Sequence, residues 1–181
     1  MSVRTALRAA TRPEHEAVDA LFGRFDLSDS QGYRAFLAAT RAAFAPVEQA
    51  IDQAGGEKAL EDWPGRRRAA LLAADCLDMG ADDLPAVDAP VLNGPAETLG
   101  AIYVLEGSRL GGALLRRGVP ASWPTRFLNA SMEPGSWPKL IATLETALTR
   151  PEDLRAAIAA AQAVFRCFET AATDQECVER V

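Results

Sequence analysis

Helical spacing of apolar residues recurs along almost the whole chain, and no convincing run with a period of two residues interrupts it. Glycine and proline clusters separate the helical stretches. The apolar residues are mostly alanine and leucine, which favour helix over strand. With 181 residues and no linker-like segment, residues 1–181 are predicted to form one all-α domain, a helical bundle.

Capping and breaking residues predict where the helices lie. Thr11 and Glu14 have the spacing of a capping box ahead of a helix that continues to Phe22. Gly55 and Gly56 end a second long helix that begins after Asp29. The predicted helical stretches are residues 3–10, 12–22, 30–54, 65–80, 96–117, 137–148 and 152–172, with irregular segments between about 82 and 95 and between about 118 and 136.

Charge and cysteine content restrict the class of protein. The net charge of −6, from 19 basic and 25 acidic residues, argues against general nucleic-acid binding. No apolar run approaches the roughly 20 residues needed to span a membrane, and the first residues lack the apolar core of a secretory signal. Cys76, Cys167 and Cys177 have no metal-ligand or redox spacing, so we expect reduced thiols in a cytoplasmic protein.

The stretch ETLGAIYVLEGSRLGGALLRR combines helical spacing with an unusual number of glycines. It contains Gly100, Gly107, Gly111 and Gly112, and each interior glycine costs roughly 1 kcal/mol relative to alanine. Close helix packing through Gly107 and Gly111 is one explanation. A flat ligand lying on the backbone is another, because glycine removes the Cβ that would collide with it. A phosphate loop is excluded, since neither its spacing nor a preceding strand is present.

His15 is the only histidine of the chain. One imidazole without a ligand cluster cannot build a protein-only zinc or di-iron site. It can supply one axial bond to a metal already held by a macrocycle, as in haem proteins. An ordinary hydrogen-bonded histidine is the alternative. Taken with the glycine-rich helix, His15 suggests that two helices enclose a planar ligand with a central metal.

Two segments carry a resemblance to a known family. LRAATRPEHEAVDALF resembles the proximal helix of haem oxygenases, and YVLEGSRLGGALLRR resembles their distal helix. The likeness covers about residues 5–170 and is strongest to the bacterial branch, which includes enzymes that supply biliverdin to bacteriophytochromes. The resemblance implies a single-domain haem-oxygenase-like helical bundle.

The resemblance also implies roles for individual residues. His15 would be the iron ligand, and Arg8 and Arg12 would lie near the haem propionates, on the His15 face if one helix carried all three; solvated surface charge is the alternative for both arginines. Tyr103 would contact the haem edge, while Phe165, with Phe168, would close the pocket or simply pack in the core. The residues expected against the other haem face are Gly107, Ser108, Gly111 and Gly112.

The activity implied by the resemblance uses haem as both cofactor and substrate. With O2 and electrons from an external donor, a ferredoxin or a reductase, haem would be opened to biliverdin, CO and iron. A bacteriophytochrome could receive the biliverdin. The animal enzymes carry an aspartate where this chain has Ser108, so the distal polar groups must be organised differently, through Ser108, glycine backbone groups or Arg109.

Three other functions fit parts of the pattern. A haem or bilin carrier of the same fold would bind the ligand without turnover. A thiaminase-like enzyme would need a catalytic thiol, and none of the cysteines has an evident activating neighbour in the sequence. A helical module that only binds other proteins would leave the stability cost of the clustered glycines without a ligand to offset it.

Overall fold

The computed structural model describes the backbone of residues 2–130 and 133–179, and side chains as far as residue 175. This part of the chain is helical and contains no strand, so the predicted all-α fold is confirmed. None of its helices is long and apolar enough to cross a membrane. The α-helices are α1 (Val3–Ala10), α2 (Arg12–Phe22), α3 (Ser30–Gln53), α4 (Gly56–Ala59), α5 (Ala69–Met79), α6 (Pro95–Leu115), α7 (Arg126–Asn129), α8 (Ser136–Ala147) and α9 (Pro151–Glu179), with short 3-10 helices η1 (Trp63–Arg66) and η2 (Arg116–Gly118).

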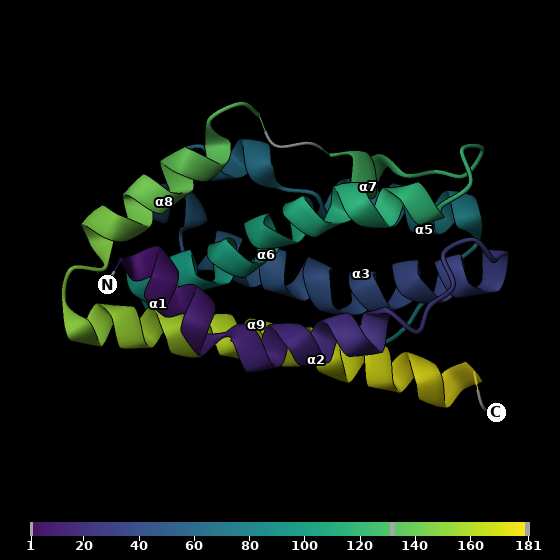
Figure 1. The fold of residues 1–181 in the computed structure, drawn as a ribbon, viewed down its shortest axis with the longest axis horizontal. Helices are drawn as coiled ribbons and strands as arrows, with labels where there is room; N and C mark the ends of the chain where they lie inside the picture. The colour runs from purple at the N-terminus through teal and green to yellow at the C-terminus, as the bar shows by residue number, and fades with distance from the viewer. Residues whose placement is uncertain (1, 131–132, 180–181) are drawn as a thin grey trace.

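The three long helices α3, α6 and α9 form the core. α6 packs most extensively on α9, and α3 packs against both of them. Figure 1 shows α6 and α9 running in the same direction, close together at the left and separated at the right. The face of α3 that contains Phe36, Phe44, Val47 and Ile51 is buried almost completely, as its helical spacing predicts.

Capping and helix-breaking residues account for several of the helix ends. Asp29 caps α3 by accepting hydrogen bonds from Gln31 N at 2.9 Å and Gly32 N at 3.0 Å. Gly80 ends α5 with a left-handed φ of 63°, which glycine adopts without steric cost. Pro95 starts α6, where its missing N–H would have no helical partner.

The first two helices differ from the prediction at Thr11. The residue has φ −100° and ψ 1°, and its side chain makes no capping hydrogen bond to α2. Its hydroxyl instead donates to Leu7 O, at 2.8 Å, in the preceding helix. The predicted capping box is therefore wrong. Residues 3–22 form two helices that meet at Thr11, because this residue closes α1 rather than opening α2.

The packing of α2 is much looser than that of the core helices. It lies on α9 (Figure 1), yet none of its residues is fully buried, and Val18, Leu21 and Phe22 remain half-buried. Two cysteines, Cys76 and Cys167, are buried free thiols, and the side chain of Cys177 lies outside the described residues.

Candidate functional site

His15 lies on α2 with its ring against α9. The ring meets Phe165 edge to face, with 5.6 Å between the ring centroids and 69° between the planes. Nδ1 lies 3.0 Å from Asp19 Oδ2, one turn further along α2, and the side chain is 59% exposed. Because an ionised carboxylate only accepts hydrogen bonds, the neutral ring carries its proton on Nδ1 and its lone pair on Nε2. This tautomer leaves Nε2 as a potential metal ligand.

The first part of α6 is pressed against α9. A Cβ on Gly100 would lie 2.1 Å from Ala157 O, so only glycine permits this approach of the two helices. Residues 99–102 and 104–106 are buried. We refer to residues 95–106 as the packed half of α6.

The same face of α6 is open in its second part, residues 107–115, which we call the open half. Gly107 and Gly111 lie seven and eleven residues after Gly100, within about 20° of it around the helix axis. A Cβ on either glycine would meet no atom within 4 Å. Leu110 and Leu114, which lie near them at helical spacing, are 59% and 68% exposed. The open half therefore presents glycine backbone bordered by uncovered leucines, which is unusual for a surface helix.

His15 and the open half lie at the same level of the bundle. Phe165, which holds His15, follows Ala157 by eight residues, and Gly107 follows Gly100 by seven. Since α6 and α9 run in the same direction (Figure 1) and rise about 1.5 Å per residue, the histidine and the glycines lie at nearly equal distances beyond the contact between Gly100 and Ala157.

Arg8, Arg12 and Tyr103, the residues expected at the polar edge of the haem, lie on three different helices. Arg12 forms an exposed pair with Glu16, Nε to Oε1 3.6 Å, which contributes little to stability. Arg8 lies on α1, and the break at Thr11 removes it from the helix that carries His15. The pKa of Tyr103 is raised by burial, while the charges of Arg4 and Arg8 oppose that rise. Arg8 therefore lies close enough to Tyr103 for their charges to interact.

The remaining predicted residues lie in three different settings. Phe165 and Phe168 are buried in the core, and Phe165 is the one that contacts His15. Gly112 is buried beside Leu128, with 3.5 Å between its would-be Cβ and Leu128 O, and does not share the open face of Gly107 and Gly111. Ser108 is exposed at the edge of that face.

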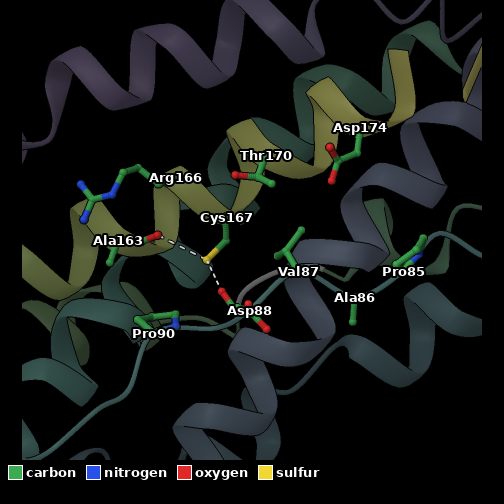
Figure 2. Close-up of a pocket in the computed structure, with 10 residues that line it drawn as sticks. All are labelled: Pro85, Ala86, Val87, Asp88, Pro90, Ala163, Arg166, Cys167, Thr170 and Asp174. Atoms are coloured by element: carbon green, nitrogen blue, oxygen red, sulfur yellow. Dashed lines mark hydrogen bonds between the residues drawn. The ribbon is translucent and has the colours of Figure 1, made fainter. Parts of the chain in front are cut away.

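A separate hollow of about 490 Å³ lies between α9 and the segment 85–90 (Figure 2). Cys167 lines it, and its single S–H lies within weak hydrogen-bonding distance of Ala163 O, at 3.3 Å, and Asp88 O, at 3.5 Å. Cys167 lies about 160° from Phe165 around the axis of α9. This hollow therefore opens on a different side of α9 from His15.

Comparison with known proteins was made by sequence and by structure. No family model matches the sequence. A protein from Xanthomonas campestris pv. campestris (strain 8004) named "Heme oxygenase" is 33% identical over 132 residues, which cover 65% of this chain and 79% of that protein. The chain belongs to the haem oxygenase family.

Solved structures of the family have the same fold. The NO- and CO-bound haem oxygenase of Neisseria meningitidis matches with a TM-score of 0.79 and 21% identity, over 97% of this chain and 92% of that one. The haem oxygenase of Leptospira interrogans matches with a TM-score of 0.75 and 17% identity, over 96% of this chain and 100% of that one. The predicted haem-oxygenase-like bundle is thereby confirmed.

Ser108 and Arg109 both donate hydrogen bonds within the protein. Ser108 Oγ donates to Leu105 O at 2.6 Å. Arg109 donates from Nε to Glu106 Oε1 at 2.8 Å, from Nη1 to Ala130 O at 2.9 Å, and from Nη2 to Arg66 O. Ser108 therefore has no free donor proton, whereas Arg109 uses three of its five N–H protons on partners in the described part of the chain.

Sequence reasoning missed a buried ionic network behind α6. Arg66 Nη1 donates to Glu106 Oε2 at 2.8 Å, and Arg68 Nη2 donates to Ser108 Oγ at 2.9 Å. Glu48, on α3, accepts from Arg68 N at 2.6 Å and from Ala69 N at 3.2 Å. The three consecutive arginines of GRRRAALL were the available signal. They were interpreted only as the start of a helix, because burial of alternate arginines cannot be read from spacing alone.

Proposed function

We propose that this protein is a haem oxygenase that opens haem, with O2 and external electrons, to biliverdin, CO and iron. The observation that carries the proposal is the placement of His15 on α2 at the level of the open half of α6. Haem is planar and largely apolar, so a ligating nitrogen on one side and uncovered glycine backbone on the other are what its two faces require.

Each part of the site has a role toward haem. His15 Nε2 would bind the haem iron, and Asp19 would hold the ring in the orientation that keeps this nitrogen free. Gly107 and Gly111 let the distal face of the ring approach the backbone, while Leu110 and Leu114 supply apolar contact that is otherwise left to water. Haem itself supplies the iron that activates oxygen and the carbon skeleton that is oxidised.

The arginines and Tyr103 supply the polar edge of this site. We assign Arg8 to a haem propionate, because it lies near Tyr103 and its side chain has no hydrogen bond or ion pair in the described part of the chain. Arg12 takes the same role only by leaving its exposed pair with Glu16. Phe165 supports the His15 ring, and Ser108 borders the distal face as a hydrogen-bond acceptor. Gly112 is buried beside Leu128, where a Cβ would make only ordinary contact, so we assign it no role toward haem.

The reaction requires partners. Electrons come from an external donor, a ferredoxin or a reductase, in the cytoplasm. A bacteriophytochrome that takes up biliverdin is the acceptor suggested by the resemblance of the EGS stretch to the bacterial branch. We propose no role for nucleic acid or membrane.

Addition of haemin to the protein, followed by a reductant in air, tests the activity. We expect a sharp Soret band that decays into the broad absorption of biliverdin. A stable Soret band would favour the haem or bilin carrier, and the absence of haemin binding would overturn the proposal.

Substitution of His15 tests the iron ligand. His15→Ala removes Nε2 and should abolish the wild-type ferric spectrum and most turnover, while added imidazole should restore the spectrum by occupying the vacated position. Asp19→Asn keeps the ring and should lower turnover about tenfold through loss of its orientation. A wild-type spectrum and rate in His15→Ala would show that another residue binds the iron.

A further inference from the structure

Arg68 is a buried cation that lacks a directly paired carboxylate. It precedes α5, is 3% exposed, and has its guanidinium 4.9 Å from the ring centroid of Phe44 and 4.7 Å from that of Phe127. Among the described side chains no carboxylate forms an ion pair with this guanidinium, and its Nε has no hydrogen-bond partner. Arg66, only two residues earlier, pairs with both Glu106 and Asp62.

The charge of Arg68 is costly where it lies. Burial of a charge without a direct counter-charge is unfavourable, and the two phenyl rings offset only part of that cost. Burial and the neighbouring charge of Arg109 lower the pKa of Arg68 to about 9, against the opposing effect of Glu106 and Glu48. Arg68 is therefore still positively charged at neutral pH.

The guanidinium of Arg68 reaches α6 where the packed half meets the open half. Its Nη2 donates to Leu105 O at 2.5 Å and to Ser108 Oγ at 2.9 Å. Ser108 Oγ donates its single proton to the same Leu105 O. Arg68 thus holds the Ser108 hydroxyl in one orientation and places a positive charge beside the first turn of the open half.

We propose that Arg68 is a positioning residue of the distal surface, which fixes the Ser108 hydroxyl and makes this surface favour anionic over neutral ligands of the haem iron. The inference rests on the proposed function, because the surface acts only when haem lies between α2 and α6. A unit charge about 10 Å from an anion, at an effective dielectric constant of about 20, changes its affinity by about tenfold.

Ligand titrations of the haem complex test this role without turnover. Azide on ferric iron is the anionic probe, and CO on reduced iron is the neutral probe. Arg68→Met, which keeps the length and removes the charge, should weaken azide about tenfold and leave CO affinity nearly unchanged. The C–O stretching frequency should rise, because a positive field near the ligand lowers it. Arg68→Lys should retain most of the azide affinity.

Two further variants separate this role from a loss of structure. Arg150→Met removes another arginine, an exposed one that pairs with Glu152 ahead of α9, and should change neither probe. If Arg68→Met does not fold, Arg68→Gln removes the same charge and keeps a polar side chain. Equal weakening of azide and CO, or no change in either, would overturn the inference. A wild-type protein that does not bind haemin would overturn the proposed function, and this inference with it.

Discussion

The two halves of α6 use glycine for opposite purposes. In the packed half, Gly100 lets α9 approach so closely that a Cβ would lie 2.1 Å from Ala157 O. In the open half, Gly107 and Gly111 continue the same face and meet nothing within 4 Å. One helix face thus changes from a packing surface to an uncovered one over two turns, because α9 separates from α6 (Figure 1).

The difference shows how the cost of an interior glycine can be offset. Each such residue costs roughly 1 kcal/mol relative to alanine. At Gly100 the gain is burial of the surrounding apolar surface between two helices. At Gly107 and Gly111 no contact within the described protein supplies a comparable gain, and the haem proposed to lie there would supply it. The predicted helix-packing alternative therefore applies to Gly100 and not to the pair for which it was considered.

The largest effect is expected at the junction between the halves. Glu106 is 1% exposed and bridges Arg66 and Arg109, so Glu106→Gln leaves buried Arg109 without a counter-charge and Arg66 with Asp62 alone. We expect a loss of about 4 kcal/mol in the free energy of unfolding, measured by urea denaturation. Glu152→Gln, at an exposed pair with Arg150, is the control and should have little effect. Equal stability of the two variants would mean that the network does not anchor α6.

A smaller loss is expected in the packed half. Gly100→Ala forces α6 and α9 apart, and overpacking minus the gain in helix propensity should cost about 2 kcal/mol. The thermal midpoint of the ligand-free protein is the measurement. If Gly100→Ala were as stable as the wild type, α6 and α9 could move apart without loss of stability. The close packing at Gly100 would then not distinguish the packed half from the open half.

The smallest effect on stability, and one of opposite sign, is expected in the open half. Gly107→Ala and Gly111→Ala place a methyl group in open space and should stabilise the ligand-free protein by about 0.5–1 kcal/mol each. Both should weaken haemin binding, because the methyl group occupies the space assigned to the ring. Gly112→Ala is the matched control, since its Cβ would make only ordinary contact with Leu128, and haemin affinity should be retained. Unchanged haemin affinity in Gly107→Ala and Gly111→Ala would contradict the placement of haem on this face.

Most of the fold was predictable because local chemistry fixes helix position. Asp29 and Pro95 mark helix starts, and the apolar spacing of α3 matches its buried face. Thr11 shows the limit of such reasoning. Its hydroxyl could bond forward to α2 or back to α1, and packing of Leu7 in the core accompanies the second choice.

The site was predictable only in part. His15 and the open glycines could be singled out from residue type and spacing. Asp19 lies one turn from His15, so the same helical spacing places its carboxylate beside the imidazole. Arg68 and Glu48 were not accessible, because their role depends on which of several charged side chains the fold buries.

The sequence by itself determined that this chain is a bundle of helices, that a single imidazole is available, and that one helix carries more glycine than its stability favours. These properties follow from residue types and their spacing along the chain. Only the tertiary structure decided which glycines are packed and which are open, and that Arg68 lies behind Ser108. The separation of α6 from α9 depends on contacts between residues distant in sequence, such as Gly100 with Ala157, and no local pattern encodes that distance.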